Sequence, residues 1–395
     1  MKGYQFEDTQ GTFHLKKAEN ISYLYFPIAG EAGLKSSFTP NLGGDAKIDQ
    51  NTFLLEPVSA ENLVNNRNSR NFWCNVKGIG SWSLTGHSAE ELSKKFTEMQ
   101  DDSEVTAGFM WQKTTRESKK YQLRGEILSF IPVDKNVEIM LVTITNTGRM
   151  AQTVTPTAAI PLYGRSADNI RDHRHVTSLL HRIETTDTGV LVTPTLSFDE
   201  RGHQVNHMTY YCVGWSGNGE KPVDFYPTAE DFVGEGGNFE RPYAIVKNAE
   251  GVKAGTKIEG LEAVGGLHFS EITLEPEEEC SYLIFTGITE DIQEIRNLSK
   301  TYTTREKVLE ELEKTKAYWQ EKVNVAYHTG DSDFNQFMHW VSFQPILRRI
   351  YGCSFLPHHD YGKGGRGWRD LWQDCLALLL MNPSGVRQMI LDNYG

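Results

Sequence analysis

The segment "GKGGRGWRDLWQD", residues 362–374, is the part of the sequence that best distinguishes between the possible fold classes. Its glycines at positions 362, 364 and 367 have the G-x-G-x-x-G spacing of a dinucleotide-binding loop. Such a loop follows a strand and opens the helix of a βαβ unit. Here the preceding segment has a helical pattern, and Lys363 lacks the following Ser or Thr of a Walker loop. A nucleotide-binding fold is therefore not predicted, and the glycines need another explanation.

The charged and aromatic residues of this segment offer one, because they form pairs at helical spacing. Each pair is four residues apart and so shares one face of a helix: Asp370 with Asp374, Arg369 with Gln373, and Trp368 with Trp372. The nearby guanidinium groups, including Arg366, should lower the pKa values of both aspartates. Ionised carboxylates, guanidinium, amide and indole groups suit a sugar-binding pocket. The alternative is structural, with Asp370 as an N-cap beside an Arg–Asp pair; spacing alone leaves both open.

Residues 1–288 are predicted to form β structure. Short β-branched or aromatic runs, such as "VEIMLVTITN" (137–146) and "QTVTPTAAIPL" (152–162), are bounded by turn residues. Since regular helices do not alternate with these runs, a sandwich is favoured over a parallel α/β sheet. We expect one helical insertion at 88–96, with Ser88 as N-cap and Glu91 at the third helical position. Residues 226–242 are predicted to be a long loop.

The pattern becomes helical after residue 288. Residues 289–325 are predicted to be a helical linker with one apolar stripe: Val308, Leu312, Thr315, Trp319 and Val323. In 326–395 we expect helices with a kink near Pro345, and a last helix with Asn382 as N-cap and Pro383 at its first position. The leucines between 376 and 380 point in several directions and need neighbours all round, so this region is expected to begin an all-helical domain that continues beyond Gly395.

Composition excludes several classes of protein. The chain has 395 residues and a net charge of -12, which argues against nucleic acid or an anionic membrane as the main partner. No apolar stretch approaches the eighteen residues of a membrane span. Five scattered cysteines without a C-x-x-C pattern indicate reduced thiols in a cytoplasmic protein. His203 with His207, and His358 with His359 and Asp360, lack a third clustered ligand and are predicted not to bind metal.

The last part of the sequence resembles a known family. "YGKGGRGWRDLWQDCLALLLMNPSGVRQMILDNYG" (361–395), with its "G-x-R-D-x-x-Q-D" core, is similar to the start of the catalytic barrel in the cellobiose-phosphorylase-like family of inverting β-glucoside phosphorylases (glycosyl hydrolase 94 type). "DFNQFMHWVSFQ" (333–344) resembles the first barrel helix of that family. The N-terminal β region looks like its galactose-mutarotase-like supersandwich. The resemblance implies a supersandwich at 1–288, a helical linker at 289–325 and the first helices of an (α/α)6 barrel at 326–395.

The resemblance also implies a function. Arg369 and Asp374 are expected to bind the non-reducing glucosyl unit, with Asp370 and Gln373 as adjacent candidates and Arg366 and Trp368 as further ones. The enzyme would transfer glucose from a β-glucoside to inorganic phosphate, without a cofactor and as a homodimer. The general acid of the family is an Asp further along the barrel, so it is expected beyond Gly395, and residues 1–395 alone are expected to be inactive.

Two other functions fit the same residues. One is a related inverting hydrolase, in which water replaces phosphate as the nucleophile. The other is a non-catalytic carbohydrate-binding sandwich with a helical tail. Phosphate separates the enzymes, because only a phosphorylase makes glucose 1-phosphate.

Overall fold

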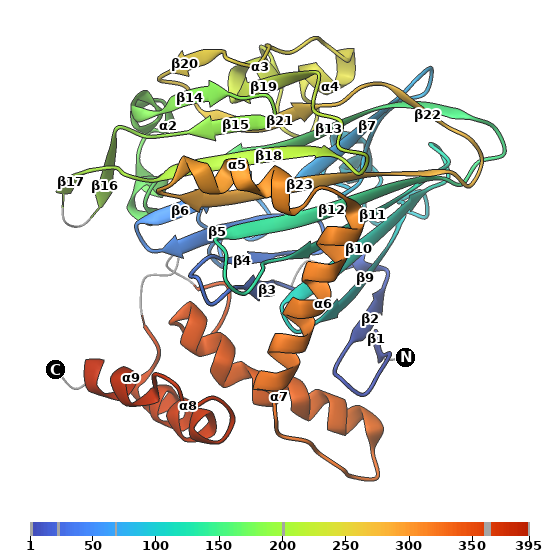
Figure 1. Cartoon of the computed structure of the whole chain (residues 1–395). Coiled ribbons are helices and arrows are strands. Elements are labelled where there is room, and N and C mark those ends of the chain that lie inside the picture. The colour runs from blue at the N-terminus through green and yellow to red at the C-terminus, as the bar shows by residue number, and fades with distance from the viewer. Residues whose placement is uncertain (1–2, 22–23, 68, 200–201, 359–364, 394–395) are drawn as a thin grey trace.

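The protein consists of packed β-sheets with a group of helices below them (Figure 1). The computed structural model describes residues 3–21, 24–67, 69–199, 202–358 and 365–393. Every strand pairing in these residues is antiparallel, as expected for runs of strands without crossover helices.

The largest sheet has eleven strands. In spatial order they are β1 (Tyr4–Phe6), β2 (Phe13–Lys16), β9 (Asp102–Gly108), β10 (Trp111–Ser118), β11 (Leu123–Phe130), β12 (Val137–Asn146), β23 (Glu279–Thr289), β18 (Thr209–Ser216), β15 (Gly189–Val192), β14 (Arg182–Thr185) and β20 (Lys257–Glu259). All ten residues of β12 are buried, because both faces of this central strand are covered.

Three smaller sheets complete the β region. The six-stranded sheet contains β19 (Asp224–Thr228), β21 (Ala263–His268), β13 (Gln152–Leu162), β7 (Asn71–Val76) and β8 (Gly80–Ser83), with β22 (Ile272–Leu274) paired to β13. The four-stranded sheet contains β3 (Phe26–Ala29), β4 (Lys35–Phe38), β5 (Gly44–Asp49) and β6 (Thr52–Leu55). The hairpin pairs β16 (Leu196–Asp199) with β17 (Gly202–Val205).

The main core joins the three larger sheets, with residues such as Val142 and Ile284 of the large sheet and Ile160 of the six-stranded sheet. Helices α5 (Ile292–Thr301) and α6 (Arg305–Lys322) cover the other face of the large sheet, where Leu312 packs with Phe285. Their apolar stripe therefore explains why the central strands are buried on both sides.

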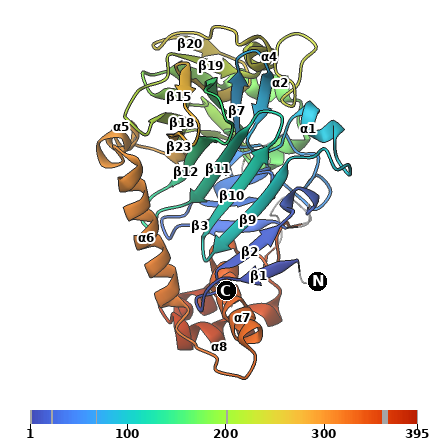
Figure 2. The same cartoon turned by 90° about the vertical axis from the view of Figure 1, so that its right-hand side faces the viewer.

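The remaining helices are of two kinds. Short ones lie in the β region: η1 (Ala18–Asn20), α1 (Ala89–Ser93), η2 (Ala167–Arg171), α2 (Arg174–Thr177), η3 (Ser178–Leu180), α3 (Ala229–Val233) and α4 (Tyr243–Lys247). Below the sandwich lie α7 (Ser332–Tyr351), α8 (Trp368–Met381) and α9 (Val386–Asp392), which α6 reaches from the side of the sheet (Figure 2). Trp319, fully buried near the end of α6, packs with Phe343 of α7 and Leu371 of α8. None of the helices in the described residues combines the length and apolar character needed to cross a membrane.

Several predicted elements are confirmed. Strands β12 and β13 have the predicted bounds, Ser88 caps α1 by accepting from the Glu91 backbone N–H, and the linker stripe is buried. The predicted cap of the last helix is wrong: Asn382 ends α8, and α9 begins at Val386 after Gly385. Gly385 has a φ of 77°, a conformation that favours glycine, so the chain turns there before the helix starts. The segment 226–242 is not all loop, because it contains α3.

His181 should make the stability of the sandwich depend on pH. Its ring is fully buried, its Nδ1 donates to the Leu261 carbonyl 3.2 Å away, and burial, followed by the nearby Arg165, lowers its pKa to about 3. An unfolded histidine has a pKa of about 6.5, so the unfolded chain binds the extra proton first. Stability from this group is complete above pH 6.5 and falls as the pH drops toward 3, by about 2 kcal/mol between pH 6.5 and 5.

Urea unfolding at a series of pH values measures this effect. His181→Asn keeps a donor for Leu261 and should flatten the free energy of unfolding in that window, whereas His203→Asn, on the exposed strand β17, should not. An unchanged slope in the His181 variant would contradict the prediction.

Candidate functional site

Helix α8 begins at the end of the glycine-rich segment. Gly367 is its N-cap, and its backbone N–H donates to the Ser354 hydroxyl 3.3 Å away, in the segment after α7. A Cβ on Gly367 would lie 3.2 Å from a carboxylate oxygen of Asp370, so glycine leaves room for that side chain. At Gly365 a Cβ would meet no atom within 4 Å, while Gly362, Lys363 and Gly364 lie outside the described residues.

Asp374 lies at the centre of an ion-pair cluster between α7 and α8. It is only 1% exposed. Arg348 of α7 donates to both of its carboxylate oxygens, with Nη2 2.6 Å from Oδ1 and Nε 2.9 Å from Oδ2. Arg366 donates to Oδ2 from the other side at 3.1 Å. Two cations and one carboxylate thus join α8 to α7, and their charge-assisted bonds occupy the carboxylate of Asp374.

Asp370 is one helical turn earlier and faces the same way. It accepts from the Ser354 hydroxyl at 2.9 Å and from Arg369 Nη2 at 3.2 Å. The hydrogen bond from Ser354 has the larger effect and that from Arg369 the smaller, and both lower the pKa of Asp370. The predicted decrease for this aspartate is therefore confirmed. The shared face of the two aspartates is also observed. Of the structural alternative, the N-cap is wrong, because Gly367 caps α8, but the Arg–Asp pair is present, because Arg366 donates to Asp374.

The remaining predicted site residues lie on a different side of α8. Trp368, Arg369 and Gln373 are exposed, with the Arg369 side chain at 84%. The indole rings of Trp368 and Trp372 meet edge to face, with centroids 5.6 Å apart. Within the described residues no hydrogen bond or ion pair joins Arg369 to Asp374. Asp374 and Arg366 are therefore packed with Arg348 of α7, whereas Trp368, Arg369 and Gln373 face outward. Asp370 lies between these two groups and bonds to Ser354 and to Arg369.

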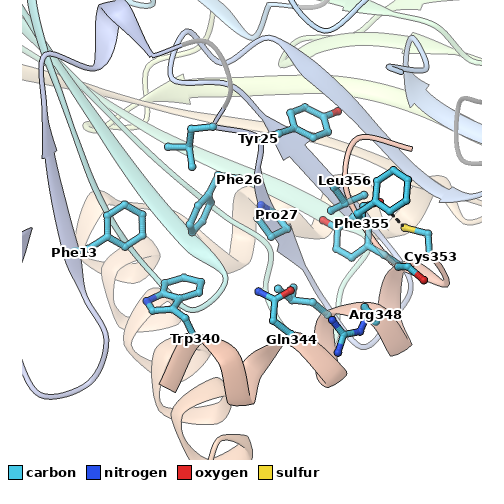
Figure 3. Close-up of a pocket in the computed structure, with 14 residues that line it drawn as sticks. Phe13, Tyr25, Phe26, Pro27, Trp340, Gln344, Arg348, Cys353, Phe355 and Leu356 are labelled. Carbon is cyan, nitrogen blue, oxygen red and sulfur yellow. Dashed lines mark hydrogen bonds between the residues drawn. The ribbon is translucent and has the colours of Figure 1, made fainter. Parts of the chain in front are cut away.

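A cavity of about 390 Å³ lies beside the buried group (Figure 3). Phe26 and Pro27 of β3 form one wall, and Trp340, Gln344 and Arg348 of α7 form the opposite one (Figure 3). Arg348 and Ser354 line this cavity and also hold Asp374 and Asp370. The two aspartates thus support the cavity wall through residues that the sequence did not identify as part of the site.

The contacts of this arrangement are hydrogen bonds and ion pairs. A general acid is a protonated carboxyl with a raised pKa, whereas Asp370 is shifted the opposite way. In the described part of the chain, the carboxyl with a raised pKa is Glu91, where burial is the main cause. Glu91 lies in α1, on the sandwich, where it accepts from the Asp101 backbone N–H. It is therefore not a proton donor for this site.

The predicted histidine pairs can be followed only where their residues are described. The described residues contain no group of three His, Cys, Asp or Glu side chains placed to bind a metal ion. His203 lies against the Phe198 ring, and the His358 ring stacks on Phe355 with centroids 5.6 Å apart. His359 and Asp360 lie outside the described residues.

Comparison with known proteins gives a family and two relatives. Residues 55–305 match the family model "Glycosyl hydrolase 94, supersandwich domain". The cyclic β-(1,2)-glucan synthase NdvB of Rhizobium meliloti is 26% identical over 185 residues, which is 46% of this chain and 6% of the synthase. The 3-O-β-D-glucopyranosyl-β-D-glucuronide phosphorylase of Paenibacillus borealis is 23% identical over 293 residues, 69% of this chain and 33% of that protein. The chain therefore corresponds to a third or less of these relatives.

Among solved structures, a bacterial glucoamylase complexed with acarbose superimposes with a TM-score of 0.42 and 9% identity, covering 80% of this chain and 39% of that one. This similarity is too weak to assign a site. The family model, by contrast, covers well over half of the chain and includes most of the sandwich described above. The chain is thus a member of glycosyl hydrolase family 94 that contains its supersandwich domain.

Proposed function

We propose that this chain is the N-terminal part of an inverting β-glucoside phosphorylase. The family match and the phosphorylase among its relatives support this assignment. The observation that carries it is the geometry of the motif at 367–374. Arg348 donates to Asp374 and Ser354 donates to Asp370, and both donors line a cavity that also has aromatic walls. Guanidinium and aromatic groups together are suited to binding a sugar.

In the proposed domain plan, residues 1–288 are the supersandwich, 289–325 the linker and 326–395 the first helices of an (α/α)6 barrel. The exposed apolar side chains of α8 support the last assignment. Leu376, Leu379 and Leu380 are 68%, 55% and 77% exposed, and a water-facing helix rarely carries such a row. Further barrel helices would cover them.

In the proposed reaction, the glycosidic bond at the anomeric carbon is replaced by a bond to phosphate. A phosphate oxygen attacks C1 of the β-linked glucosyl unit, the bond from C1 to the bridging oxygen breaks, and that oxygen takes a proton from a general acid. The products are α-glucose 1-phosphate and the free acceptor sugar. Because phosphate is already an anion, the carboxylate base that an inverting hydrolase uses to activate water is not needed.

The motif residues take two roles in this proposal. Trp368, Arg369 and Gln373 are not among the residues that line the cavity; they face outward and would contact the glucosyl unit from the open side of α8. Asp374 would act through Arg348 and Arg366 by fixing their guanidinium groups, and Asp370 would orient Arg369. Sugar hydroxyls can then accept from the guanidinium groups while a ring face lies on an indole.

Product analysis of the natural protein that contains these residues tests the reaction. Cellobiose, laminaribiose, sophorose and 3-O-β-glucosyl-glucuronide are each incubated with and without phosphate. We expect glucose 1-phosphate from at least one of them, and only with phosphate. Equal release of glucose without phosphate would favour the hydrolase, and binding without either product would favour the non-catalytic sandwich.

Arg369→Ala tests the site within this reaction. Loss of an exposed sugar contact should raise KM at least tenfold, about 1.4 kcal/mol. Arg387→Ala, an exposed arginine on α9, is the matched control and should leave KM unchanged. A wild-type KM in the Arg369 variant would remove this residue from the proposed site.

A further inference from the structure

A second cavity lies on the sandwich, apart from the motif of α8. Its volume is about 300 Å³, at the lower end of the range for small-ligand pockets, roughly 300–1,000 Å³. Its walls come from η1 and Ile21, the turn between β4 and β5, residues 63–66, His87, α1 with Lys95, and Glu240. None of these residues lines the cavity beside α7, and α1 lies well away from α7 and α8 (Figure 2).

Four of the residues that line this second cavity have polar side-chain groups without a partner in the described part of the chain. Among the described residues, no hydrogen bond or ion pair uses the Thr39 hydroxyl, the Nδ2 of Asn41, the Asn65 side-chain amide or the ring nitrogens of His87. Thr39 is 8% exposed. Asn65 is exposed and Asn41 and His87 are half-buried, so water reaches these groups, and a ligand with similar hydrogen-bonding groups can replace that water. A ligand that donates and accepts hydrogen bonds can therefore use them.

These polar groups stand on a rigid support. Arg116, 1% exposed, donates from Nη2 to the Asn41 Oδ1 at 3.4 Å, which leaves the NH2 of that amide for the cavity. The guanidinium passes so close to Gly86 that a Cβ there would lie 2.5 Å from it. On the opposite wall, the Glu240 carbonyl accepts from the Ala89 N–H at 2.8 Å and so is fixed to the start of α1. Such a supported arrangement is typical of a binding site.

We propose that this cavity binds a saccharide unit of a β-glucan. The wall mixes neutral amide, hydroxyl and imidazole groups with the aliphatic side chains of Ile21, Leu63 and Val64, which matches the hydroxyls and C–H faces of a sugar ring. Among the lining residues, an anionic ligand would meet two carboxylates, Glu19 and Glu240, against the one ammonium group of Lys95, and an apolar ligand would leave the polar groups unpaired. The choice of a β-glucan rests on the proposed function, whereas the cavity and its open hydrogen-bonding groups do not.

Such a site would hold a long glucan at a distance from the motif. The sandwich would then contribute to substrate capture without touching the reacting bond.

Hydrogen exchange followed by mass spectrometry locates the site. The chain of residues 1–395 is mixed with glucohexaoses of β-1,2, β-1,3 or β-1,4 linkage. We expect at least one of them to protect peptides covering 39–43, 63–66 and 85–95. Protection confined to 365–381 would support the motif of α8 and overturn the second site, and no protection anywhere would overturn it as well.

Val64→Arg places a bulky side chain at the mouth of the cavity. Val64 is 63% exposed, so the substitution should not disturb folding, and Tm checks this. Met150→Arg makes the same kind of change at another apolar position, 71% exposed and outside the cavity. By calorimetric titration, Val64→Arg should weaken hexaose binding at least tenfold and Met150→Arg less than twofold. Asn41→Leu should act like Val64→Arg. Equal affinities in all variants would overturn the proposal.

Discussion

Replacing Asp374 with alanine is expected to weaken the packing of α8 on α7 by about 3–5 kcal/mol. The substitution leaves Arg348 and Arg366 facing each other without the carboxylate that both contact. Their side chains are only 28% and 9% exposed, so water cannot fully replace the lost countercharge. Hydrogen exchange of the backbone amides in α8 measures the effect as faster exchange across 368–381. If Asp374 also fixes the sugar-binding guanidinium groups, activity in the natural protein should be lost as well.

Arg369→Ala is the control for stability in this experiment. Its side chain is 84% exposed and pairs with Asp370, and water screens a surface pair of this kind, so it contributes little to stability. Exchange across α8 should therefore stay near wild type in Arg369→Ala while sugar binding weakens. Wild-type exchange in Asp374→Ala would show that the cluster does not hold the helices together.

A double variant tests whether the loss in Asp374→Ala comes from the unpaired charges or from the missing side-chain volume. Combining Asp374→Leu with Arg348→Met replaces one ion pair by apolar groups of similar size and leaves one unpaired guanidinium, that of Arg366, instead of two, so part of the lost stability should return. We expect exchange in the double variant to be slower than in Asp374→Ala. Binding of the glucosyl unit should not recover, because Arg348 no longer lines the cavity.

Local patterns predicted much of the fold. The runs at 137–146 and 152–162 form β12 and β13, as predicted. β-Branched residues between turn residues favour an extended backbone, and this preference does not depend on which strand lies next to them. The buried face of the linker helix, from Val308 to Val323, was predictable because apolar residues at helical spacing lie on one side of a helix, and that side packs against the protein. Each of these signals is contained within about twenty residues.

Pairings between distant segments were not predictable in this way. β12 lies beside β23, about 140 residues later, and nothing in either run specifies the other. The same limit applies to the candidate site: Arg348 and Asp374 are 26 residues apart and on different helices. Spacing identified Asp370 and Asp374 as sharing a face, but it could not show that this face is turned toward α7 and that Arg369 and Gln373 point away.

Replacing Glu138 with alanine is expected to destabilise the whole sandwich by about 3–5 kcal/mol. Glu138 of β12 and Arg70, just before β7, are both 0% exposed, and Arg70 donates to Glu138 from Nε at 2.5 Å and from Nη2 at 3.2 Å. Without the carboxylate, a guanidinium is left buried in the core without a countercharge among the described residues, where its remaining partners are the carbonyl groups of Leu42 and Asp45 and the face of the Phe38 ring. Urea unfolding should show a lower midpoint.

Two further variants test this explanation for Glu138. Lys77→Ala breaks a surface pair with Glu271, whose side chains are 70% and 50% exposed, and should change the free energy of unfolding by less than about 1 kcal/mol. Glu138→Leu combined with Arg70→Met should recover much of the loss, because no unpaired charge remains. A midpoint for Glu138→Ala equal to that of Lys77→Ala would contradict the prediction.

The effect of Glu138 should also reach the helices. Ser36 of β4 donates to Glu138 at 2.5 Å, and its carbonyl accepts from the Tyr351 hydroxyl at the end of α7, also at 2.5 Å. The buried pair thus connects the large sheet, the four-stranded sheet and the helix that carries Arg348. We therefore expect Glu138→Ala to speed amide exchange at the end of α7 as well as in β12. Faster exchange in β12 alone would mean that the sandwich and the cavity wall are stabilised independently.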